Sequence, residues 1–177
     1  MKIAFILADG FEDSEMVVTR DLLVRAGFDV TLFGLGKKIV EGSAGIKIIS
    51  DEQFSPEKLE GFDGVVLPGG RGYKYLLQSE SVRKSLKEAN EKKKMIAAIC
   101  AAPVVLAEAG ILDDVKATVY PGFEKKIPHP RNGSVVVDKN IITANGPGAA
   151  FHFGLKIIEY FLGKGSSEKI KNEMVIQ

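Results

Sequence analysis

The apolar positions along this chain fall into short continuous runs that alternate with longer amphipathic stretches. Four of the runs, at Lys2–Ala8, Asp29–Leu35, Phe62–Leu67 and Met95–Ile99, have the length of strands and few charged side chains. Runs of this kind predict strands that are buried on both faces, as in a parallel sheet.

The amphipathic stretches between these runs predict helices. Their apolar residues recur at helical spacing, and capping residues or glycines mark their ends. The predicted segments are a helix from Asp13 or Ser14 to Gly27, a loop or short helix over Tyr73–Gln78, a helix from Ser79 or Ser81 to about Lys93, a helix over Ala102–Ala109 with Pro103 in its first turn, a helix over Ala149–Leu162, and a short helix from Ser166 onward.

The remaining apolar segments are shorter. They predict a hairpin within Gly34–Ser50 and strands over Ala117–Tyr120, Ser134–Val137 and Ile141–Ala144. Strands that alternate with helices in this way predict an α/β fold, a flavodoxin-like three-layer sandwich with a doubly wound, mostly parallel sheet. Because no linker or repeat interrupts it, the chain 1–177 is expected to form a single domain.

The charged residues and the single cysteine narrow the class of protein. Lys and Arg number 24 against 23 Asp and Glu, without a long block of one sign, which argues against a nucleic-acid surface or a polybasic membrane anchor. The apolar run before Asp9 is too short for a signal peptide, and the stretch Met95–Ala107 is too short to span a membrane. One cysteine cannot form an intramolecular disulfide, so we expect a soluble cytoplasmic protein.

The candidate chemistry centres on that cysteine, Cys100. Its apolar neighbours favour a small buried side chain without a chemical role. Its place after a strand, where sites form in open parallel sheets, favours a nucleophile on a sharp strand-to-helix turn. The adjacent helix N-terminus is expected to lower the pKa of the thiol. Ala98 and Ala102 stand where such a turn usually has glycine, so the motif alone is a weak signal.

Two other loops would meet this sulfur if their strands are neighbours. Glu15 either complements the dipole of its own helix or serves as hydrogen-bond partner and proton carrier for Cys100, with a raised pKa. Gly69 and Gly70 either form an ordinary tight turn or present amides to a developing oxyanion, together with the amide of Ala101.

Cofactor and metal sites have no support in the sequence. The two histidines, His129 and His152, are interpreted as a surface-loop and a helix residue, and with one cysteine they make no zinc set. Neither GxGxxG nor GxxxxGKS/T occurs, so we expect no cofactor and no metal.

Four motifs in order, ILADGFEDSE, VVLPGG, AAICAAP and NGPG, carry a resemblance that runs nearly from end to end. Together they resemble the ThiJ/PfpI superfamily, most closely the branch named for the parkinsonism-associated deglycase. The resemblance implies a class I glutamine amidotransferase-like fold and a homodimer. It also implies that Cys100 is the reactive cysteine, that Glu15 hydrogen-bonds it, and that Gly70 and Ala101 supply oxyanion amides. His129 is the candidate for a pocket histidine that the branch often has.

The activities that the resemblance implies define the functional hypotheses. The main one is a cofactor-free hydrolase or lyase of the glyoxalase or deglycase type, acting on small reactive carbonyls such as methylglyoxal or on glycated side chains. The alternative is an oxidative-stress protein, redox-sensing or chaperone-like, in which Cys100 is oxidised. An intracellular cysteine peptidase is disfavoured because Ala101 stands where that branch has histidine. A glutamine amidotransferase is disfavoured because no His-x-Glu follows late in the chain.

Overall fold

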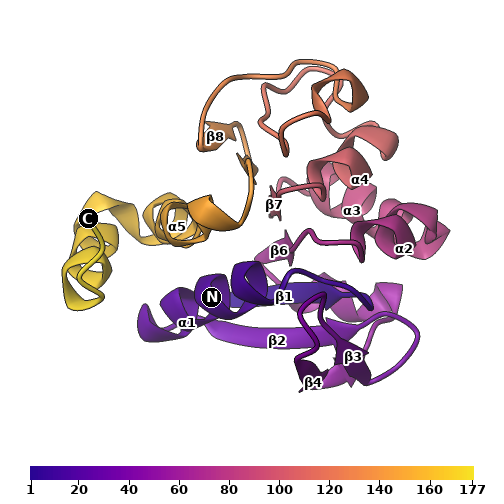
Figure 1. Ribbon diagram of the computed structural model, residues 1–177, viewed down its shortest axis with the longest axis horizontal. Helices are drawn as coiled ribbons and strands as arrows, with labels where there is room; N and C mark the ends of the chain where they lie inside the picture. Colours follow the sequence, from indigo (N-terminus) through magenta and orange to yellow (C-terminus); the bar gives the residue numbers. More distant parts are fainter.

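The computed structural model describes residues 1–177 and contains a seven-stranded central sheet (Figure 1). The strand order is β5-β2-β1-β6-β7-β9-β8, and all neighbours are parallel except β8 and β9. Its strands are β1 (Lys2–Leu7), β2 (Asp29–Gly34), β5 (Glu52–Gln53), β6 (Gly64–Leu67), β7 (Met95–Ile99), β8 (Val135–Asp138) and β9 (Ile141–Ala144).

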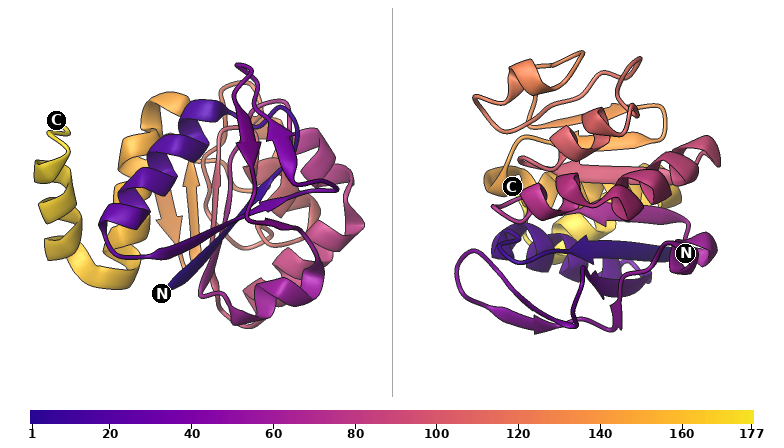
Figure 2. Two further views of the ribbon diagram at one scale, coloured as in Figure 1. Left: turned by 90° about the horizontal axis from the view of Figure 1, so that it is seen from below. Right: turned by 90° about the vertical axis from the view of Figure 1, so that its right-hand side faces the viewer.

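Helices cover both faces of this sheet (Figure 2). On one face α1 (Asp13–Arg25) packs against α5 (Ala150–Glu173), and on the other α2 (Tyr73–Gln78), α3 (Glu80–Glu91) and α4 (Pro103–Glu108) pack together. The short 3-10 helices are η1 (Pro56–Gly61), η2 (Glu124–Lys126) and η3 (Pro147–Ala149). Every residue of β6 and β7 is buried, as expected for strands covered on both sides. The predicted doubly wound, flavodoxin-like fold is confirmed.

The predicted hairpin is present as a separate two-stranded sheet, β3 (Ile39–Glu41) and β4 (Lys47–Ile49). Asp13 holds its tip against α1, because the buried carboxylate accepts the amides of Ala44 and Ile46 at 2.8 and 3.2 Å. The predicted capping of α1 by Asp13 or Ser14 is therefore wrong. Glu12 occupies the N-cap position without a side-chain hydrogen bond, and Asp13 lies inside the first turn.

The structure differs from the prediction mainly in short segments. Ala117–Tyr120 is not a strand, because its only ladder contact is an isolated bridge between Ala117 and Pro130. The amide of Thr118 bonds to the side chain of Thr143 instead of to a neighbouring strand. Four short elements were not predicted at all, the two-residue strand β5 and the 3-10 helices η1, η2 and η3.

Two helices show the local signals that the sequence predicts. Ser79, one of the two predicted caps of α3, accepts the amide of Val82 through its hydroxyl. Gly163, with φ of 78°, kinks α5, and the last segment of α5 contains the short helix predicted from Ser166.

The centre of the sheet places β1, β6 and β7 side by side, so the loops that follow their carboxyl ends meet at one edge.

Candidate active site

Cys100 occupies a sharp turn directly after β7. Its φ is 64°, a left-handed conformation that is uncommon for a residue with a side chain. Two hydrogen bonds of 2.8 Å hold this backbone, one from the Cys100 amide to the carbonyl of Ala144 and one from the amide of Tyr120 to the carbonyl of Cys100. Neighbouring segments therefore stabilise the strained turn that the sequence position predicted.

Gly69 and Gly70 bring backbone directly against Cys100 and Glu15. The amide of Gly69 donates to Glu15 Oε2 at 2.7 Å. A Cβ at position 69 would lie 2.6 Å from the Cβ of Cys100, and at position 70, where φ is 72°, it would lie 2.5 Å from the amide nitrogen of Glu12. Both positions therefore require glycine, and the close packing aims the backbone at the sulfur.

The carboxyl of Glu15 is buried below the sulfur. The residue is 1% exposed, and Oε1 is buried without a hydrogen bond of good geometry. Burial raises the pKa of Glu15 to about 7, against the lowering effect of the Gly69 amide and of the Cys100 thiol. A raised pKa was predicted for this carboxyl, and its main cause is desolvation. Glu15 can therefore both accept and donate a proton near neutral pH.

The thiol behaves differently from the prediction. Burial, followed by the negative charge of Glu15, raises the pKa of Cys100 to about 12. The amides of Gly70 and Ala101 hydrogen-bond the sulfur and lower the pKa, but by less. The expected lowering by a helix N-terminus is wrong, because α4 is only six residues long and desolvation outweighs its effect.

The chain is similar to known proteins along nearly its whole length. The model of the DJ-1/PfpI family matches residues 1–160. The chain belongs to the DJ-1/PfpI family. It is 36% identical to the Drosophila melanogaster protein dj-1beta over 177 residues, which cover 97% of this chain and 95% of that protein. It is 34% identical to a Caenorhabditis elegans protein named glutathione-independent glyoxalase DJR-1.2, over 86% of this chain and 83% of that protein.

Solved structures of the DJ-1 family have the same fold. Toxoplasma gondii DJ-1, oxidized, superposes with a TM-score of 0.93 at 32% identity, over 98% of this chain and 97% of that chain. Drosophila melanogaster DJ-1beta gives a TM-score of 0.92 at 35% identity, over 99% and 98% of the two chains. The resemblance to the ThiJ/PfpI superfamily is thereby confirmed.

Not all predicted site residues meet at the sulfur. Five of them come together: Cys100, Glu15, Gly69, Gly70 and Ala101. The His129 ring instead hydrogen-bonds the carbonyl of Asp113 at 2.8 Å and makes no hydrogen bond to these five residues.

Sequence reasoning missed two residues that position the site. Tyr120 holds the backbone of Cys100, and Phe11 forms bridges to both Gly42 and Gly70. Tyr120 was assigned to a strand, and Phe11 lay unnoticed inside the motif ILADGFEDSE. The available signal for Phe11 was an aromatic residue directly after the turn glycine Gly10.

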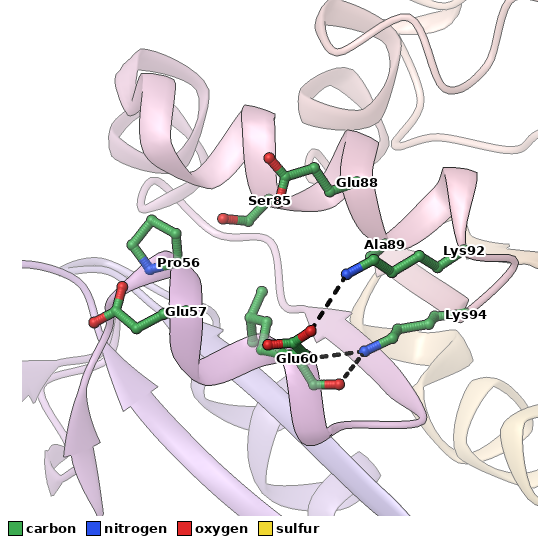
Figure 3. A pocket seen from close by; sticks show the side chains of 9 residues that line it. Pro56, Glu57, Glu60, Ser85, Glu88, Ala89, Lys92 and Lys94 are labelled. Atoms are coloured by element: carbon green, nitrogen blue, oxygen red, sulfur yellow. Dashed lines mark hydrogen bonds and ion pairs between the residues drawn. The ribbon is translucent and has the colours of Figure 1, made fainter.

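A small cavity of about 140 Å³ lies elsewhere, between η1 and α3 (Figure 3). Lys94 spans it, donating to the carbonyls of Leu59 and Glu60, and Lys92 faces the Glu60 carboxylate (Figure 3). Because η1 precedes β6 and Lys94 precedes β7, this cavity is at the amino ends of the strands, opposite Cys100. Its lysine satisfies carbonyls at the end of η1, which is a structural role.

Metal ligands and membrane helices are not features of the structure. No group of three or more His, Cys, Asp and Glu side chains is placed to hold a metal ion. None of the helices combines the length and the apolar character needed to cross a bilayer.

Proposed function

We propose that the protein is a glutathione-independent glyoxalase that converts methylglyoxal into lactate. The observation that carries the proposal is the packing of Cys100 and Glu15 around Gly69, where one added Cβ would lie 2.6 Å from the Cβ of Cys100 and 3.0 Å from Glu15 Oε2. Burial there raises the pKa of Glu15 to about 7. The name of the C. elegans relative, glutathione-independent glyoxalase, supports the same reaction.

The first step is addition of sulfur to the aldehyde carbon. The Glu15 carboxylate takes the thiol proton as the carbon–sulfur bond forms, and passes it to the new oxyanion to give a hemithioacetal. The amides of Gly70 and Ala101, which face the sulfur, stabilise the negative oxygen during this step. Cys100 therefore needs no preformed thiolate, because its proton leaves while the bond forms.

The second step moves a proton between adjacent carbons. The Glu15 carboxylate removes the proton from the former aldehyde carbon and returns it to the neighbouring carbon. The hydroxyl proton of the hemithioacetal passes to the former ketone oxygen through the enediol, and the product is a lactoyl thioester. Water then hydrolyses the thioester, which releases lactate and restores the thiol of Cys100. The sum is methylglyoxal plus water giving lactic acid, so no oxidant or reductant is required.

The test is lactate production from methylglyoxal without glutathione. Wild-type protein should form lactate, and Cys100→Ser and Glu15→Gln should reduce turnover to background. Glu12→Gln is the matched control, because Glu12 is half-buried at the start of the same helix and bonds to serine hydroxyls instead of the sulfur. No lactate from the wild type would refute the proposal.

The same adduct chemistry supports glycated side chains as a second substrate class. An early adduct of methylglyoxal on an amine or thiol is a hydroxyl-bearing carbon next to a ketone, and transfer of that carbon to Cys100 leads into the same thioester. A deglycase should release free amine from such an adduct together with lactate. Release of methylglyoxal without lactate would show instead that free carbonyl is the substrate.

A second candidate function is oxidation of Cys100 under stress. The solved relative from Toxoplasma gondii is described as oxidized, which favours testing this chemistry here. Two equivalents of peroxide would take the thiol through the sulfenic to the sulfinic acid, each peroxide being reduced to water. Mass spectrometry after mild peroxide should then show two added oxygens on Cys100, and an unmodified thiol would exclude this function.

We also propose that two copies of the chain pair through α1 and the β3–β4 hairpin. This face exposes Val17 and Ile49, at 44% and 77%, beside a groove of about 800 Å³. The groove also carries Arg20, whose buried Nε has no partner, and carboxylates such as Asp51, so a second copy can supply opposite charges. Sedimentation should show a dimer that Ile49→Glu weakens, whereas a monomeric wild type would contradict the proposal.

A further inference from the structure

A hollow of about 580 Å³ lies beside the Gly69–Gly70 turn, and the proposed reaction leaves it without a role. It is bordered by the loop after β1, by the β3–β4 hairpin and by α2. Its lining residues are Asp9, Gly10, Glu41, Gly42, Arg71, Lys74, Tyr75 and Gln78. We call it the Arg71 hollow.

Two glycines form part of the wall of this hollow. A Cβ on Gly10 would lie 3.3 Å from the Cβ of Arg71, and φ of 80° at Gly10 already disfavours any side chain. A Cβ on Gly42 would lie 2.3 Å from the carboxylate of Asp13. The backbone therefore forms part of the wall, and the side chains that remain are almost all polar.

The carboxylates of the hollow are already paired with cations outside its lining. Asp9 Oδ2 lies 2.5 Å from Lys37 Nζ, and the pKa of Asp9 is lowered mainly by this bond, so Asp9 is ionised and neutralised. Glu41 Oε2 lies 3.8 Å from Lys47 Nζ. Each carboxylate of the lining therefore has a lysine from outside the lining beside it.

The cations of the hollow have no such partners. The guanidinium of Arg71 makes one long hydrogen bond, 3.4 Å to the carbonyl of Ser43, and no ion pair. Lys74 makes neither a side-chain hydrogen bond nor an ion pair, and the hydroxyl of Tyr75 and the amide of Gln78 add further donors beside it. The hollow therefore carries uncompensated positive charge, which suits an anion.

The position of Arg71 connects the hollow with the sulfur. Arg71 follows Gly70, whose amide hydrogen-bonds Cys100, and consecutive Cα atoms are about 3.8 Å apart. The hollow therefore begins one residue beyond the turn that faces the sulfur. Arginine also matches the two oxygens of a carboxylate or phosphate with parallel hydrogen bonds.

We propose that Arg71 and Lys74 bind the carboxylate or phosphate of the substrate whose carbonyl reacts at Cys100. The inference rests on the proposed function and narrows its substrate class to anionic carbonyl compounds, such as oxidised or phosphorylated sugar fragments. Arg71 is a specificity residue, because it touches the substrate at a group that does not react.

The test uses three-carbon probes that carry no carbonyl and so cannot react with Cys100. Glycerol 3-phosphate, glycerate and glycerol are titrated into the full chain by calorimetry. At least one anion should bind more tightly than glycerol, and Arg71→Gln and Lys74→Gln should each weaken it by about tenfold, as expected for a charged hydrogen bond. Lys87→Gln, an exposed and unpaired lysine on α3, is the matched control and should leave binding unchanged.

The outcomes separate the two anions and the two proposals. Preference for glycerol 3-phosphate assigns the hollow to phosphate, and preference for glycerate assigns it to carboxylate. The bound anion should also slow alkylation of Cys100 by iodoacetamide in the wild type but not in Arg71→Gln. Equal binding of all three probes, equal weakening by Lys87→Gln, or binding without protection of Cys100 would overturn the inference. Lactate formation from neutral methylglyoxal depends on none of these outcomes.

Discussion

Replacing Glu15 by glutamine should change the pH dependence of stability in a specific direction. Folding moves this carboxyl from water to a site where it is 1% exposed, and its pKa rises from 4.5 to about 7. Glutamine keeps the shape and an oxygen that can accept the Gly69 amide, but it has no charge to bury. The substitution therefore isolates the cost of ionising a buried carboxyl.

The sign follows from proton binding. Between pH 4.5 and about 7 the folded state retains a proton that the unfolded state has released, so the free energy of unfolding falls as pH rises. Stability from neutral Glu15 is fully present below pH 4.5 and is lost through pH 7, with a total of about 3 kcal/mol. For a chain of this size that corresponds to a Tm difference of about 6–12 °C.

Thermal unfolding followed by circular dichroism at pH 5 and pH 8 measures this effect. Glu15→Gln should gain Tm relative to the wild type on going from pH 5 to pH 8, while Glu80→Gln, at an exposed carboxylate at the start of α3, should follow the wild type. The contributions of the other titrating groups to Tm cancel, because the difference between the variant and the wild type is taken at each pH. A Tm difference between Glu15→Gln and the wild type that stays constant with pH would refute burial as the cause of the raised pKa.

Three further predictions concern neighbouring groups. Gly69→Ala should abolish lactate formation and lower Tm, because its Cβ would lie 2.6 Å from the Cβ of Cys100, whereas Gly165→Ala, with open space around it, should do neither. Iodoacetamide should alkylate Cys100 more slowly than a free thiol at pH 8, because its pKa is raised to about 12, and Glu15→Gln should speed the reaction by removing the adjacent charge; equal rates would contradict this. Asp13→Ala should cost about 1–3 kcal/mol and speed hydrogen exchange in the β3–β4 hairpin, because its buried carboxylate accepts two hairpin amides; unchanged exchange would count against that anchor.

The central strands were predictable because burial on both faces leaves a direct trace in the sequence. A strand such as β7 needs apolar side chains at every position, and the run Met95–Ile99 shows them. Ala117–Tyr120 also has apolar residues, but these residues are apolar for another reason than membership of a strand. The side chains of this segment are largely buried, while the amide of Thr118 donates to a threonine hydroxyl. The apolar composition therefore reflects burial of the segment and not pairing with a neighbouring strand.

The candidate site was predictable in its residues but not in its electrostatics. Cys100 follows β7 and Glu15 lies in the first turn of α1, after β1, so a doubly wound fold brings both to one edge of the sheet. Only the order of the strands was needed to join them. The pKa of the thiol depends on how much water the surrounding loops exclude. No local pattern encodes that quantity, and the dipole of a short helix was therefore given too much weight.

The coupling of Cys100 and Glu15 bears on which proposed function the site serves better. A thiol with a pKa of about 12 presents little thiolate at neutral pH, and peroxide reacts with the thiolate. Addition to a carbonyl differs, because proton transfer to a carboxylate with a pKa of about 7 accompanies bond formation. We therefore expect the resting thiol to react slowly with peroxide, whereas the proposed addition to a carbonyl needs no preformed thiolate. The arrangement favours carbonyl chemistry over redox sensing for the same pair of residues.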